Sequence, residues 1–194
     1  MITHIDGKLV EKTPTYAIID CGGVGYLLNI SLNTFSKIGS SEKCKLYTHL
    51  AIREDAHVLY GFADQEERIL FRHLISVSGV GAATARMILS SLSPAEIQQA
   101  ILMGNVPVLK SIKGIGEKSA QRIIIDLKGK LGKDELGPNY FGTSDNKSRE
   151  EALSALVMLG FAKNMAEKAV DKVLKAEGSS VSVEQIIKLA LKNL

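Results

Sequence analysis

The sequence has few of the residues that usually carry catalysis or bind metals. Its 194 residues include two cysteines and four histidines. Cys21 and Cys44 lack the spacing of a zinc site or a dithiol redox motif, so we expect them to be reduced and structural. The histidines are scattered, without a pairing that suits a metal or a general base. We therefore predict no catalytic residue, no metal site and no cofactor bound by this chain.

The chain also lacks a long apolar run, a signal peptide and a nucleotide-binding loop. No stretch is apolar for long enough to span a bilayer, which predicts a cytoplasmic protein without a membrane partner. The Gly-x-x-x-x-Gly-Lys-Ser/Thr loop that cradles ATP phosphates is missing, so an autonomous ATPase is disfavoured. The net charge is only +3, so the chain is not basic throughout.

What the chain does contain is an internal repeat. LISVSGVGAATARMI (74–88) aligns with LKSIKGIGEKSAQRI (109–123), and Gly79 then falls on Gly114. Each copy has an apolar helix end, a Gly-Val-Gly or Gly-Ile-Gly turn, and a second helix. A single Gly-x-Gly would be explained equally well by an ordinary turn between helices. Repetition of the whole pattern resembles the helix-hairpin-helix family.

The repeated turns are suited to holding phosphates. Their glycines allow positive φ and close approach of a partner. Val80 and Ile115 are expected to fill the core beneath the hairpins, while unpaired amides at the start of each following helix favour an anion. Two such hairpins would grip successive phosphates of one DNA backbone without reading bases. The predicted contact residues are Gly79, Val80, Gly81, Ala83, Thr84, Gly114, Ile115, Gly116, Lys118, Ser119 and Arg122.

Charge supports this interpretation around the second copy. Between residues 109 and 133, seven lysines and arginines accompany two acidic residues. A local basic stripe is typical of phosphate binding, and the alternative is a solvated helix face.

The pattern on either side of the repeat predicts a multidomain α+β protein. Five β-branched and aromatic runs, with a helical insert at 33–38, predict an OB-fold barrel over residues 1–63; a small barrel without a ligand of its own is the alternative. The repeat makes a helical domain over 64–131, and glycine, proline and serine at 132–147 predict a flexible linker. Ser148 and Glu151 form a capping-box pattern that opens a three-helix bundle over 148–194. The strand runs are 1–11, 15–20, 24–30, 45–52 and 57–62.

The three-helix bundle has little core of its own, so its apolar residues are candidates for a docking face. Packing in the core is the alternative for each of them. The residues concerned are Leu156, Leu159, Phe161 and Leu191.

Four stretches in order carry a resemblance that covers the whole chain. They are CGGVGYLLNIS (21–31), THLAIREDAHVLYGF (48–62), the paired hairpins, and ALVMLGF (155–161). Together they resemble the RuvA family of Holliday-junction-binding subunits. The resemblance implies a non-catalytic, sequence-independent binder of four-way junction DNA that acts in recombination and repair. It implies a homotetramer, or an octamer of two tetramers. It also implies a third domain that binds the hexameric motor RuvB, which uses ATP and Mg²⁺, and collaboration with the resolvase RuvC.

The resemblance also assigns a role to two carboxylates at Glu54 and Asp55. In most proteins they would be solvated turn residues. In the RuvA family, the matching acidic residues form a pin at the tetramer centre, where they repel phosphates and guide the separating strands.

The chain departs from the family in the first hairpin. Many relatives have a lysine where this sequence has Ala83, so we expect Lys118 and Arg122 to supply more of the electrostatic attraction. Two other functions are considered. One is a DNA glycosylase/lyase that uses Lys118 as a Schiff-base amine with Asp134 nearby, although no base-flipping pocket or iron–sulfur cysteine set is visible. The other is a duplex-binding scaffold without a preference for junctions.

Overall fold

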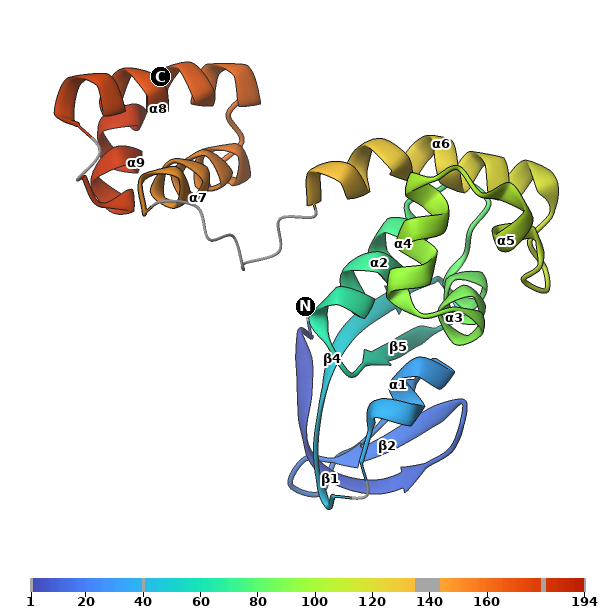
Figure 1. The fold of residues 1–194 in the computed structure, drawn as a ribbon. Helices are drawn as coiled ribbons and strands as arrows, with labels where there is room; N and C mark the ends of the chain where they lie inside the picture. The colour runs from blue at the N-terminus through green and yellow to red at the C-terminus, as the bar shows by residue number, and fades with distance from the viewer. Residues whose placement is uncertain (1, 40, 135–143, 179–180, 194) are drawn as a thin grey trace. The chain divides into compact units, whose positions relative to one another are not determined.

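The computed structural model describes residues 2–39, 41–134, 144–178 and 181–193 (Figure 1). The chain divides into two compact units, Met1–Glu135 and Leu136–Leu194. Among the described residues, no helix is both long and apolar enough to cross a membrane.

The first unit begins with the predicted OB-fold barrel. Five strands close in the order β1-β2-β3-β5-β4, and all neighbours are antiparallel except β3 and β5, which are parallel. A short helix, α1 (Leu32–Lys37), is inserted between β3 and β4, as predicted. Alternate residues of β2 face inward, so Ala17 and Ile19 are fully buried. The strands are β1 (His4–Lys12), β2 (Tyr16–Asp20), β3 (Gly25–Asn29), β4 (Lys43–Ile52) and β5 (His57–Phe62).

The helical part of this unit carries the repeat. Ser93 and Glu96 form a capping box at the start of α4, as their spacing indicates. The helix that follows the second hairpin, α6, continues to Asp134, which is beyond the predicted boundary at 131. Leu127 and Leu131 lie on its buried face, and packing of that face outweighs the cost of about 1 kcal/mol for each glycine inside a helix. The helices are α2 (Gln65–Ile75), α3 (Ala82–Ser91), α4 (Pro94–Leu102), α5 (Val106–Lys110) and α6 (Glu117–Asp134).

The helices share an apolar cluster with strand β5 of the barrel, whereas the barrel interior has a separate core around Ile19 and Leu28. Phe71 of α2 lies 5.1 Å from Tyr60 and 4.9 Å from Phe62, measured between ring centroids, and 5.4 Å from the ring of His49. The same cluster of buried residues continues through both hairpins to Leu131. The predicted domain boundary between residues 63 and 64 therefore falls inside a continuous core.

A buried carboxylate reinforces the joint between barrel and helices. Glu67 of α2 is fully buried and accepts hydrogen bonds from the hydroxyls of Ser31 and Thr34, the latter at 2.7 Å. The Thr34 hydroxyl in turn accepts from the backbone amide of Ala63 at 3.0 Å. Burial raises the pKa of Glu67, and the nearby Asp64 carboxylate raises it further, whereas the two hydroxyls and Lys37 lower it. These contacts fix α2 against the α1 end of the barrel.

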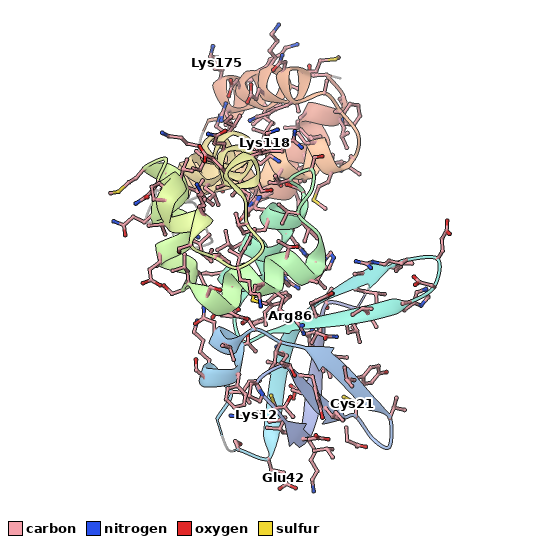
Figure 2. All side chains as sticks on the ribbon, turned by 90° about the vertical axis from the view of Figure 1, so that its right-hand side faces the viewer. Lys12, Cys21, Glu42, Arg86, Lys118 and Lys175 are labelled. Atoms are coloured by element: carbon pink, nitrogen blue, oxygen red, sulfur yellow. The ribbon has the colours of Figure 1, made fainter. Side chains whose placement is uncertain are left out.

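A second polar contact holds the repeat itself to the barrel. Arg86 of α3 donates one guanidinium nitrogen to the side-chain oxygen of Asn29 at 2.8 Å and to the Thr15 carbonyl at 3.2 Å. Figure 2 shows Arg86 between the barrel and the helices. The first hairpin is therefore fixed relative to the barrel through its own helix.

The second unit is the predicted three-helix bundle. Its helices are α7 (Ser144–Met158), α8 (Lys163–Glu177) and α9 (Val183–Leu191). They pack around small and medium apolar residues such as Ala152, Val170 and Ile186. The helix α7 begins at Ser144, four residues before the predicted capping box, so Ser148 lies inside the helix and not at its start. Both ends of the predicted linker at 132–147 are thus helical, and residues 135–143 lie outside the described residues.

The Glu67 site predicts a pH dependence of stability. Burial raises the pKa of Glu67 in the folded protein. The contribution of Glu67 to the free energy of unfolding is therefore most favourable below its unfolded-state pKa, and it is lost as the pH rises through its folded-state pKa. Glu67→Gln cannot titrate at this position, so the free energy of unfolding of the native protein relative to this variant should fall across that window. Urea unfolding from acidic to neutral pH measures the difference. Glu66→Gln, at an exposed neighbour, is the control; equal slopes for all three proteins would contradict the prediction.

Candidate nucleic-acid interface

The two hairpins have the same backbone geometry. Gly79 and Gly114 have φ of 88° and 89°, values that favour glycine. In both turns, the amide of the central apolar residue donates to the carbonyl three residues earlier at 3.0 Å, from Val80 to Val77 and from Ile115 to Ile112. The repeat in the sequence is therefore a repeat in the structure.

The central residues of the hairpins serve the core, as predicted. Val80 and Ile115 are each only 5% exposed and belong to the shared apolar cluster. Because their side chains are buried and their amides are already bonded within the turn, these two residues shape the hairpins and offer no group of their own to a phosphate. Their prediction as DNA contact residues is therefore corrected.

The groups that remain available lie at the helix starts. Gly81 precedes α3 without any side-chain cap, so the first amides of α3 have no capping partner. In both copies the helix closes on the second glycine, with Ala85 donating to Gly81 and Ala120 to Gly116 at 2.9 Å. Gly81 and Gly116 are exposed, so both helix starts face solvent. The exposed ends of two helix dipoles are suited to binding anions.

The predicted side chains around the hairpins differ in their accessibility. Ala83 and Lys118 are exposed, whereas Thr84 and Ser119 are half-buried. Lys118 makes no ion pair with any of the described residues. It is therefore available to an external anion. In contrast, Lys110 forms an ion pair with Glu117 at 3.1 Å, which reduces the charge of the basic stripe at that point.

One predicted contact residue lies at an unexpected place. Arg122 of α6 directs a guanidinium nitrogen to the first hairpin, 3.4 Å from the Ser78 carbonyl oxygen and 3.5 Å from its hydroxyl. Lys130 of the same helix donates to the Ser76 hydroxyl at 3.2 Å. Ser76, Ser78 and Lys130 were not among the predicted residues. Two signals were present in the sequence: Ser76 matches Ser111 in the repeat, and Lys130 belongs to the basic stretch at 109–133. Contacts between the copies depend on how the copies pack, which neither signal gives.

The acidic pair occupies the tip of the β4–β5 hairpin. Arg53 donates its amide to the Ala56 carbonyl at 2.9 Å and closes the turn, and Glu54 and Asp55 are exposed within it. Figure 2 shows this hairpin extending away from the rest of the barrel. The two carboxylates are therefore placed where they can act on a charged partner.

The residues considered for lyase chemistry are not brought together. Lys118 and Asp134 lie near opposite ends of α6, and sixteen residues of helix correspond to a rise of about 24 Å. In the part of the chain that the structure describes, no group of three or more His, Cys, Asp or Glu residues is arranged to hold a metal ion.

The predicted docking residues of the second unit differ in how exposed they are. Leu156 is fully buried between the helices, so it packs in the core, and its prediction as a docking residue is corrected. The helical period places Ala152 and Leu156 on the same inward face. Leu159 and Leu191 are 62% and 42% exposed, and Phe161 is half-buried against the core. Other apolar residues that the sequence did not single out are also exposed, namely Val157, Met158 and Met165.

Comparison with known proteins agrees with this architecture along the chain. Residues 1–61 match the family model "RuvA N terminal domain", residues 71–129 match "SAM-like Helix-hairpin-helix tandem", and residues 147–194 match "RuvA, C-terminal domain". Proteins named "Holliday junction branch migration complex subunit RuvA" are similar over their full lengths. Those of Christiangramia forsetii, Flavobacterium psychrophilum and Bacteroides fragilis are 54%, 53% and 52% identical, with 100% of both chains covered. With its barrel, paired hairpins and three-helix bundle all matched in order, this chain belongs to the RuvA family.

Proposed function

We propose that this chain is the DNA-binding subunit of a branch migration complex and binds four-way (Holliday) junctions. The observation that carries the proposal is the pair of hairpins with matching geometry, held by one core in a chain of the RuvA family. Neighbouring hairpins with exposed helix starts are suited to successive phosphates of one strand. Since such contacts involve no base edges, binding is independent of DNA sequence and strongly dependent on salt.

The preference for a junction comes from assembly. We propose that four copies form a homotetramer, whose fourfold symmetry matches four DNA arms, and that two tetramers enclose a junction as an octamer. Around the fourfold axis, Glu54 and Asp55 would form an acidic pin. Fixed anions there repel phosphates, keep the crossover open and direct each strand towards its arm.

The chain itself is not an enzyme in this proposal. The motor RuvB supplies ATP hydrolysis with its own ATP and Mg²⁺, and it is recruited through the exposed apolar residues of the second unit, Leu159 among them. The resolvase RuvC acts on the same open junction. The lyase alternative loses its support, because Lys118 and Asp134 are separated by the length of α6.

The first experiment is a titration of a labelled immobile four-way junction in the presence of excess linear duplex of the same sequences. Junction complexes should persist over the competitor, and their affinity should fall steeply with salt. Lys118→Ala should lower the slope of log K against log salt by about one unit per subunit, because one phosphate contact is lost. Equal loss of protein to the duplex would favour the scaffold alternative. An unchanged slope would show that Lys118 binds no phosphate.

The acidic pin predicts an opposite electrostatic effect. Neutralising both carboxylates with Glu54→Gln and Asp55→Asn removes repulsion at the crossover, so junction affinity at low salt should rise several-fold. The opening of the crossover, reported by 2-aminopurine fluorescence at the central base pairs, should decrease. Glu66→Gln removes an exposed carboxylate away from the tip and serves as the control. If the tip variant behaves like this control, the pin is not at the crossover.

If the motor docks on the second unit, a substitution there should reduce motor-driven branch migration without changing junction affinity. Leu159→Asp should leave junction affinity unchanged, since the residue belongs to the separate second unit and is largely exposed. It should strongly reduce branch migration driven by the partner motor with ATP, because a charge in an apolar interface must be desolvated. Lys168→Asp, at an exposed position on α8, is the matched control. Normal branch migration by the Leu159 variant, or by a chain without residues 148–194, would refute motor docking at this unit.

A further inference from the structure

The first hairpin has no cation of its own to offer a phosphate. Residues 76–91, which contain the hairpin and α3, include a single charged side chain, Arg86. Arg86 is engaged with Asn29 and Thr15 of the barrel, at 2.8 and 3.2 Å. In the alignment of the repeat, Ala83 and Met87 occupy the positions of Lys118 and Arg122. The two hairpins thus have the same backbone and very different charge.

The cations beside the first hairpin come from the second copy of the repeat. Arg122 lies at Ser78, the residue that immediately precedes Gly79 in the turn, with contacts of 3.4 and 3.5 Å. Lys130 lies at Ser76, two residues earlier, at 3.2 Å. Both cations project from α6 on the side that meets the first hairpin. Helix α6 therefore places the charges of Arg122 and Lys130 beside the first hairpin, which has no free cation of its own.

The present contacts of these cations are weak enough to be exchanged. Those of Arg122 are near the long limit for a hydrogen bond, and the acceptors of both side chains are uncharged oxygens of exposed serines. Among the described residues, neither cation has an acidic partner. A guanidinium has five N–H donors, so Arg122 keeps free donors. A phosphate offers these cations a negative charge and several acceptor oxygens, which the neutral serine oxygens do not.

We propose that Arg122 and Lys130 bind the phosphate held by the first hairpin, so that α6 supplies the cations for both hairpins. The inference rests on the proposed function, since it assumes that the hairpins bind DNA backbone. The first phosphate site is then a composite of two copies of the repeat: the amides come from the start of α3 and the charge comes from α6. Lys118 supplies the cation for the second hairpin. Arg122 and Lys130 replace the lysine that the first hairpin lacks at Ala83.

A double-mutant cycle between residues 83 and 122 tests this assignment. Junction affinity is measured as a function of salt for the native protein, Arg122→Ala, Ala83→Lys and the double variant. Arg122→Ala should lower the slope of log K against log salt by about one unit per subunit. Ala83→Lys should restore the slope in the Arg122→Ala background and change it less in the native background, because both side chains would reach the same phosphate. Lys130→Ala should show the same rescue.

The controls separate this inference from the proposed function. Lys128→Ala removes an exposed charge about 120° around α6 from Arg122, and it should leave the slope unchanged. Arg122→Lys should retain most of the slope, which a purely structural role in bracing the hairpin would not require. If Ala83→Lys has equal effects in both backgrounds, or none in either, Arg122 does not serve the first hairpin and the inference is wrong. If the native protein fails to bind the junction at all, the proposed function fails instead.

Discussion

The arrangement depends on one apolar cluster that holds both hairpins and joins them to strand β5 of the barrel. Val80 and Ile115 enter this core from the two turns, and Phe71 joins it to the barrel. Because interiors are close-packed, a hairpin anchored in such a core has little freedom to move relative to its neighbour. The spacing between the two exposed helix starts is therefore set by buried residues that never meet a ligand. Phosphates along a strand are also regularly spaced, so a fixed spacing is what a backbone grip requires.

Polar contacts add direction to this apolar anchoring. Hydrophobic contact has no preferred orientation, whereas hydrogen bonds to Glu67 and from Arg86 specify how the helices sit on the barrel. Both groups join elements distant in sequence. The tip with Glu54 and Asp55 belongs to the same barrel, so the exposed helix starts of the hairpins and the exposed carboxylates of the tip lie in one compact unit. A partner with phosphates at defined distances can then be attracted at some points and excluded at others.

Much of the fold was predictable because it depends on residues that lie close together in the sequence. Alternating strands, the capping box at Ser93 and the repeated glycine turns each depend on nearby residues, and the structure confirms the barrel, hairpins and bundle. The predictions that were wrong for α6 and Leu156, and the unpredicted position of Arg122, concern features that depend on packing between distant segments. The extent of α6 is decided by burial of Leu131 despite its glycines, and Leu156 differs from Leu159 only by the direction it faces. The position of Arg122 follows from how the two copies pack, which the spacing within either copy does not contain.

The division of labour between backbone and charge has a consequence for how such a chain can change. Hairpin geometry depends on glycines and buried residues, so changes there alter the core and are costly. Charge at the hairpins depends on exposed side chains, and exposed positions tolerate substitution with little effect on stability. A lysine can therefore be absent at Ala83 if another cation reaches the same space. Since α6 borders both hairpins, it is the element from which that cation can come. The two copies of the repeat therefore have the same backbone geometry although their charged residues differ.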